Sequence, residues 1–168
     1  MIEIRPESPA DYSAIHDLTA TAFESSAEAS LIDALREQAT SIISLVAERD
    51  SLILGHILFS PVSVVGQPEF SLMGLAPMAV LPDVQRQGIG SELVKAGLEA
   101  CRGLKADGVV VLGHPEFYPR FGFVPASRFD LSCEYDVPDE VFMAVELRSG
   151  ALTELSGVVN YHPAFADL

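Results

Sequence analysis

The chain has 168 residues, of which 49% are hydrophobic and 20% charged, an ordinary composition for a globular protein. Its 24 acidic and 10 basic side chains give a formal net charge of −14 at pH 7, which argues against nucleic-acid and anionic-membrane partners, because clustered Lys and Arg bind those. No run of about 18 apolar residues predicts a membrane span. The first residues, MIEIRPESP, lack the regions of a secretory signal peptide, so we expect a cytoplasmic protein with a single domain over 1–168.

The first forty residues predict a short strand followed by two helices. Apolar and charged residues alternate at positions 2–4, which indicates the strand. Ser8 has the place of an N-cap, with Pro9 in the first helical position and Asp11 three residues after the cap, so a helix should begin there. Apolar residues at helical spacing predict the second helix over 27–38.

The next forty residues predict an antiparallel meander. Segments 41–49, 52–65 and 70–80 are rich in apolar and β-branched residues and are separated by turn residues. The last of them, FSLMGLAPMAV, is nearly all apolar and should lie centrally in the sheet. Pro77 cannot donate to a strand ladder, so this strand should bulge or part from its neighbour. A parted strand would leave backbone groups at 78–80 free to bind an extended ligand.

The stretch LPDVQRQGIGSELV joins this strand to a helix that begins near Ile89. Gly88 and Gly90 lack a Cβ atom and lie at the helix N-terminus, where unpaired N–H groups and the helix dipole favour an anion. Arg86 would add a charge-assisted contact. The stretch therefore predicts either a pyrophosphate site or only a tight turn. It lacks the Lys-Ser/Thr of a P-loop and the third glycine of a dinucleotide fingerprint, so both of those sites are disfavoured.

The rest of the chain predicts one parallel unit and several short strands. Gly103 is expected to cap the helix that follows the loop, and Gly108 should open a strand over 109–112 that is parallel to the one before the helix. Residues 114–121 predict a short helix or turn, and strand-like pieces follow at 131–135 and 141–147. The tail from 153 should add a strand or lie over the surface.

Three features together resemble the GCN5-related N-acetyltransferase (GNAT) superfamily. They are Gln85-x-x-Gly88-x-Gly90 between an apolar strand and a helix, the order of elements, and Tyr118-Pro119-Arg120-Phe121-Gly122-Phe123, which is similar to the family's Tyr-x-x-x-Gly-Phe motif. The stretch 121–126 is most similar to a bacterial branch of predicted N-acetyltransferases with unassigned substrates. The resemblance covers about 1–147 and leaves 148–168 unassigned. It implies an α/β fold with a mixed, mostly antiparallel sheet of about six or seven strands, a splay between strands four and five, and about four helices.

The resemblance implies acetyl-CoA as co-substrate and no metal. The pyrophosphate would lie on the loop amides, the pantetheine arm along the splayed strand, and the acetyl group in the gap beside 109–113. The implied cofactor-binding residues are Met78, Ala79, Val80, Gln85, Arg86, Gln87, Gly88, Ile89, Gly90 and Ser91. Arg120 would either reach the phosphates or pair with an acid, and we favour the pairing.

The resemblance also implies catalytic roles. The backbone N–H near Ala79 would polarise the thioester carbonyl, and Tyr118 would protonate the leaving sulfur unless its ring only packs among aromatic neighbours. The strand SLMGLAPMAV lacks the glutamate that serves as base in many relatives. The candidate bases are therefore Glu28, His56, His114 or a water chain to solvent.

Three functions remain open at this point. The first is an N-acetyltransferase acting on a small-molecule amine or a protein amino group, which the acidic charge balance weakly favours to be cationic. The second is a non-catalytic CoA-binding module, favoured by the missing strand acid. The third is a generic α/β domain whose glycine loop is only a turn. A monomer or a homodimer is compatible with each, and Cys101 and Cys133 lack the spacing of a metal site.

Overall fold

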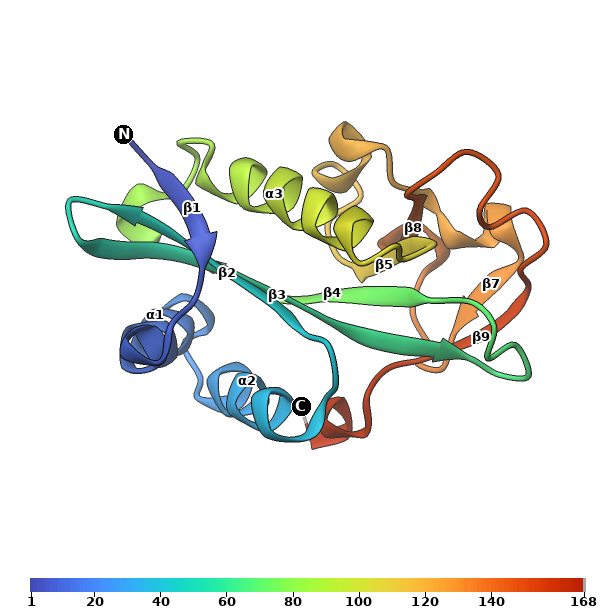
Figure 1. The fold of residues 1–168 in the computed structure, drawn as a ribbon, viewed down its shortest axis with the longest axis horizontal. Helices are drawn as coiled ribbons and strands as arrows, with labels where there is room; N and C mark the ends of the chain where they lie inside the picture. The colour runs from blue at the N-terminus through green and yellow to red at the C-terminus, as the bar shows by residue number, and fades with distance from the viewer. Residues whose placement is uncertain (168) are drawn as a thin grey trace.

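The computed structural model describes residues 1–167 and contains a nine-stranded mixed sheet with helices on both faces (Figure 1). One face is covered by α3 and the other by α1 and α2 (Figure 1). The helices are α1 (Tyr12–Phe23), α2 (Ala27–Gln38) and α3 (Ile89–Gly103). The strands are β1 (Glu3–Pro6), β2 (Ile43–Arg49), β3 (Leu52–Val64), β4 (Leu72–Val80), β5 (Gly108–Leu112), β6 (Val124–Pro125), β7 (Leu131–Cys133), β8 (Phe142–Glu146) and β9 (Gly157–Asn160). None of the described helices is long and apolar enough to cross a membrane.

The sheet confirms the mixed, mostly antiparallel arrangement. Its order is β1-β2-β3-β4-β5-β8-β6, and β9 pairs with both β3 and β7. The antiparallel meander β2-β3-β4 forms as predicted, and β4 lies centrally, parallel to β5. The sheet exceeds the expected six or seven strands because β7 and the tail strand β9 join it. In the described chain the α-helices number three rather than about four, because the prolines within 114–121 lack the N–H groups of an α-helix and leave only a 3-10 turn, η3 (Tyr118–Phe121).

Helix α3 lies very close to the sheet. The residues that it buries are Ile89, Leu93, Val94, Gly97, Leu98 and Cys101. A Cβ atom on Gly97 would stand 2.2 Å from Cε1 of Phe59 on β3, so only glycine permits this approach. The expected cap at Gly103 is wrong. Gly103 is the last residue of the helix and Leu104 is its C-cap, and Lys105 takes the left-handed conformation with φ of 63°.

The N-terminal helix begins where the sequence predicts, but its first turn, Pro9–Asp11, is a 3-10 turn that leads into α1. The backbone N–H of Ser8 donates to Oδ2 of Asp11 at 2.8 Å, which closes the expected capping box. The guanidinium of Arg5 donates to both oxygens of the same carboxylate, at 2.8 and 3.1 Å. This Arg5 contact, with burial opposing it, lowers the pKa of Asp11 to about 2.

The pairing of β4 changes at Pro77. Leu72 to Leu75 pair with β5, and the pairing stops there. On the other edge, Leu75 pairs with Phe59 and Met78 pairs with Ile57. Two residues of β4, Ala76 and Pro77, therefore stand opposite the single β3 residue between Ile57 and Phe59. This is the predicted bulge. Beyond it β4 keeps its bonds to β3 and no longer bonds to β5.

A buried polar network ties α2 to β2 and β3. The guanidinium of Arg36 donates to both carboxylate oxygens of Glu7 at 2.9 Å, and the Ser44 hydroxyl donates to Oε1 of Glu7 at 2.5 Å. Nε2 of His56 lies 2.7 Å from that hydroxyl. Because the hydroxyl donates its own proton to Glu7, we assign the imidazole proton to Nε2, which donates to the hydroxyl oxygen. Nδ1 of His56 is buried and has no hydrogen-bond partner within residues 1–167. Burial is the main cause that lowers the pKa of His56 to about 4.

Acid should weaken the fold through His56. Its folded-state pKa of about 4 lies below the ordinary value of 6.5, so between these values the unfolded chain binds more protons. The free energy of unfolding should therefore fall as the pH drops through this range, by at most about 1.4 kcal/mol per pH unit. Urea unfolding at pH 7 and pH 5 measures the change. His56→Gln should reduce the dependence and His114→Gln, at an exposed position, should keep it; an undiminished dependence in His56→Gln would contradict this cause.

Candidate active site

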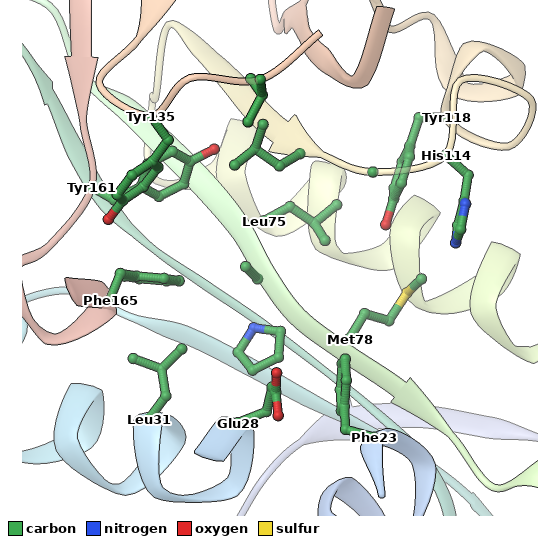
Figure 2. A pocket seen from close by; sticks show the side chains of 15 residues that line it. Phe23, Glu28, Leu31, Leu75, Met78, His114, Tyr118, Tyr135, Tyr161 and Phe165 are labelled. Atoms are coloured by element: carbon green, nitrogen blue, oxygen red, sulfur yellow. The ribbon is translucent and has the colours of Figure 1, made fainter. Parts of the chain in front are cut away.

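Two cavities meet where β4 has parted from β5. The loop cleft, of about 740 Å³, is defined by the glycine loop, the end of β4 and residues 114–120. The aromatic cavity, of about 610 Å³, lies between α2, the separated ends of β4 and β5, and the C-terminal segment (Figure 2). Met78, His114 and Tyr118 line both. A molecule in the loop cleft can therefore present one end to a molecule in the aromatic cavity.

The loop cleft gathers most of the residues predicted to bind the cofactor. All of them except Ala79 and Gln87 line it. The Ala79 side chain is buried on the far side of the β4 pleat. Gln87 borders a separate hollow beside Ile2 and Ile4 of the N-terminal segment. These two side chains therefore lie outside the cleft, because neighbouring residues of a strand or turn point in different directions.

The backbone of the glycine loop has the form of an anion site. Arg86 and Gly88 have positive φ angles, 65° and 88°, and α3 starts directly after Gly88. The first intrahelical bond runs from the N–H of Glu92 to the Gly88 carbonyl, which leaves the N–H groups of the preceding residues without helical partners. A Cβ atom on Gly90 would lie in ordinary contact, 3.8 Å from both Met78 and Phe117. The protein's own packing thus does not require glycine at 90, whereas the φ angle favours it at 88.

The backbone of β4 beyond the bulge offers free amides to the junction of the cavities. The N–H of Leu81 donates to the Leu54 carbonyl on β3 at 2.9 Å. Because backbone groups alternate along an antiparallel strand, the N–H of Ala79 also points to β3, while those of Met78 and Val80 point to the open side. Among the backbone N–H groups near Ala79, those of Met78 and Val80, and not that of Ala79, could therefore donate to a ligand on the open side. The Val80 carbonyl on that open side accepts from Nε2 of Gln85 at 3.0 Å, which ties the loop to the strand.

Tyr118 is packed among aromatic rings between the two cavities. Its side chain is 6% exposed, and its ring meets the rings of Phe117 and Phe123 edge-on, at centroid distances of 5.0 and 5.6 Å. Gly113 makes room for it, since a Cβ there would stand 2.4 Å from Cε2 of the ring. Burial raises the pKa of Tyr118 to about 12, so the hydroxyl keeps its proton at neutral pH.

The three candidate bases lie in three different parts of the structure. His114 is exposed beside Tyr118, and the Glu28 carboxylate points into the aromatic cavity from the opposite wall (Figure 2). Oε1 of Glu28 is buried without a hydrogen-bond partner in the described chain. His56 lies in its buried network and lines neither cavity.

The expected ion pair of Arg120 is absent from the described residues. Its guanidinium lies 5.3 Å from the Phe117 ring centroid, and the residue borders the loop cleft. Residues 1–167 likewise contain no cluster of His, Cys, Asp and Glu side chains suited to a metal.

The C-terminal tail supplies residues that the sequence analysis left unassigned. Tyr161, just after β9, and Phe165, in the 3-10 helix η6 (Pro163–Asp167), line the aromatic cavity together with Tyr135. The rings of Tyr135 and Tyr161 stack at a centroid distance of 6.2 Å. Tyr161 lies across Gly74 of β4, where a Cβ would stand 2.9 Å from its Cε1. In the sequence, the aromatic residues of the tail were the only indication that it contributes to a cavity, and they matched no motif.

Comparison with known proteins identifies the family. The sequence profile of the acetyltransferase (GNAT) domain matches residues 40–125. The chain is 38% identical over 163 residues to the "Uncharacterized N-acetyltransferase YhbS" of Escherichia coli K12, across 96% of this chain and 97% of that protein. The chain belongs to the GNAT family of acetyltransferases. The resemblance carried by the loop and the Tyr118 motif is confirmed.

Solved GNAT structures share the fold along nearly the whole chain. The Escherichia coli GNAT N-acetyltransferase YhbS in complex with CoA has a TM-score of 0.92 at 38% identity, covering 98% of this chain and 92% of that one. A GNAT acetyltransferase from Brucella melitensis in complex with acetyl-CoA has a TM-score of 0.81 at 36% identity, with 98% of both chains covered. The shared fold therefore extends beyond residue 147, where the sequence resemblance ended.

A methyl group at Gly113 should displace Tyr118. Because its Cβ would overlap the ring, we expect Gly113→Ala to lower the free energy of unfolding by about 1–3 kcal/mol. The matched control is Gly103→Ala, where the space around the new Cβ is open and a slight gain, about 1 kcal/mol at most, is expected. Urea unfolding of both variants measures the difference. Equal stabilities would show that Gly113 does not seat the ring.

Proposed function

We propose that this GNAT protein is an acetyl-CoA-dependent N-acetyltransferase that transfers the acetyl group to a primary amine by direct attack. The observation that carries the proposal is the junction of Met78, His114 and Tyr118, which line both cavities. A donor in the loop cleft and an acceptor in the aromatic cavity would meet there. The CoA and acetyl-CoA complexes of the Escherichia coli and Brucella melitensis relatives support the identity of the donor. The contribution of the tail to the cavity supports one acyltransferase domain over 1–168.

The donor would be held mainly by backbone groups. The pyrophosphate would accept from the amides that follow Gly88, with Arg86 and Arg120 adding positive charge at the rim of the cleft. The pantetheine arm would bond to the open-side amides of Met78 and Val80 as an extra strand does. Local N–H groups and two cations suit a chain whose formal net charge is −14.

The chain's own groups can serve each part of the acyl transfer. The neutral amine would attack the thioester carbon, forming the C–N bond. The developing oxyanion would accept from the open-side N–H of Met78, a residue that lines both cavities. As the C–S bond breaks, Tyr118 would give its proton to the sulfur, and the proton that the attacking nitrogen loses on forming the amide would restore the Tyr118 hydroxyl. His114, exposed at the junction, would pass the proton of the amine to solvent. The net reaction converts an ammonium ion and acetyl-CoA to an amide, CoA thiol and one proton.

A second candidate is a CoA-binding module without turnover. The observation that favours it is the lack of an acidic residue on β4, LMGLAPMAV. Release of free thiol from acetyl-CoA with a panel of primary amines separates the two functions. Turnover above the rate without amine would support the enzyme, whereas CoA binding without turnover on any amine would support the module.

Gly90→Ala should weaken CoA binding without weakening the fold. The added methyl group would project into the loop cleft beside Met78 and Phe117, and alanine is the better helix former. We expect the dissociation constant for CoA to rise about tenfold or more, since a lost or lengthened phosphate contact costs on the order of 1–3 kcal/mol. Calorimetric titration with CoA measures it. Gly103→Ala, at the other end of α3, should bind CoA as the parent does; equal affinity in the two variants would exclude contact of the ligand with Gly90.

Tyr118→Phe should slow turnover and spare CoA binding. The ring still fills its place between Phe117 and Phe123, and only the proton donor is lost. We expect kcat to fall about 10²-fold or more, with an unchanged dissociation constant for CoA. Steady-state thiol release and calorimetry measure the two quantities. Full activity of the variant would remove Tyr118 from the mechanism.

A further inference from the structure

We infer that the acceptor is a small primary amine with a flat apolar body, bound with its ammonium group on Glu28 and its body against Tyr135, Tyr161 and Phe165. The inference rests on the proposed acetyl transfer and names the class of acceptor for the same site. It depends on the unpaired acid, the charge of the cavity lining and the aromatic wall.

Glu28 differs from the other acids that the fold shields from solvent. Among the described residues, each of the others has a partner. These partnered acids are Glu7, Asp11, Glu48, Asp107 and Glu146. In residues 1–167, Oε1 of Glu28 is enclosed by protein and has no hydrogen-bond partner. A shielded carboxylate oxygen without a partner is costly, and an ammonium group in the cavity that donates to Oε1 would offset that cost.

The charge of the aromatic cavity selects a cation over an anion. Its lining contains Glu28 and His114 but neither lysine nor arginine. A carboxylate or phosphate in this space would meet the Glu28 charge without a compensating cation. An amine enters as its ammonium form and pairs with Glu28. It then loses one proton through His114 to solvent and attacks as the neutral amine.

The remaining wall is built for a flat apolar group. Tyr135 and Tyr161 stack, and Phe165 tilts against Tyr161 at a centroid distance of 5.3 Å. Figure 2 shows these rings at the end of the cavity away from Tyr118 and His114. An aromatic or alicyclic body of the acceptor would pack against them, while its amine reached toward Tyr118.

The C-terminal segment favours a small acceptor over a folded protein. The 3-10 helix η6 packs against α2 (Figure 1). Its Phe165 and the neighbouring Tyr161 form part of the cavity wall. A protein acceptor would have to insert a single extended side chain or terminus past this wall. A compact amine meets no such requirement.

The decisive experiment compares acceptors and variants under saturating acetyl-CoA. The probes are 2-phenylethylamine, n-butylamine, 3-phenylpropionate as an anionic competitor, and a lysine-containing peptide. We expect kcat/KM for 2-phenylethylamine to exceed that for n-butylamine about tenfold or more, because burial of the ring adds apolar contact. The peptide should be the poorer substrate, and 3-phenylpropionate should not compete.

Substitutions test whether Glu28 binds the ammonium group and whether Phe165 contacts the apolar body of the acceptor. Glu28→Gln should raise KM for the amine about tenfold or more, with a smaller change in kcat, because the charge partner of the ammonium is lost. Glu37→Gln, exposed on the same helix, should match the parent. Phe165→Ala should reduce kcat/KM for 2-phenylethylamine more than kcat/KM for n-butylamine, and an equal reduction for both would contradict the role of this ring. Thermal unfolding and CoA titration of each variant show that fold and donor site persist.

The outcomes separate this inference from the proposed function. Turnover that prefers the peptide or n-butylamine, or a KM unchanged in Glu28→Gln, would overturn the acceptor class while acetyl transfer stands. CoA binding without turnover on any amine would overturn both.

Discussion

The separation of β4 from β5 after Leu75 is the constraint on which the proposed chemistry depends. A paired parallel ladder would use every amide along β4, and the two cavities would be closed off from each other. The bulge at Ala76 and Pro77 ends that ladder while β3 still holds the strand. The amides of Met78 and Val80 then face an open space instead of a neighbouring strand. One local irregularity thus supplies both the binding groups and the junction.

Some glycines allow close packing of the protein against itself, and one leaves space beside the loop cleft. At Gly97, Gly113 and Gly74 a Cβ would overlap an aromatic ring of the protein itself, so these positions serve the packing of α3, Tyr118 and the tail. At Gly90 a Cβ would touch its neighbours only at ordinary distances. Gly90 borders the loop cleft. The absence of a side chain there would therefore let a bound ligand approach the backbone closely.

The two cavities differ in electrostatic character. The loop cleft combines the positive end of α3 with Arg86 and Arg120, which suits a polyanion within an acidic protein. Among the described residues, the lining of the aromatic cavity contains a carboxylate oxygen of Glu28 without a partner and neither lysine nor arginine. An anionic donor and a cationic acceptor would therefore be sorted to opposite sides of Tyr118 by charge alone.

The sequence by itself determined the meander, the amphipathic α3, the bulge at Pro77 and the loop at Gly88, because each depends on local rules of periodicity, on the missing N–H of proline or on the freedom of glycine. It misplaced the end of α3 by a residue or two, since Lys105 rather than Gly103 takes the left-handed turn. The tertiary structure alone decided which amides of β4 are free, because that depends on the strand that lies beside them. It alone brought the C-terminal rings to Glu28, since contacts between segments more than a hundred residues apart leave no periodic pattern in either one.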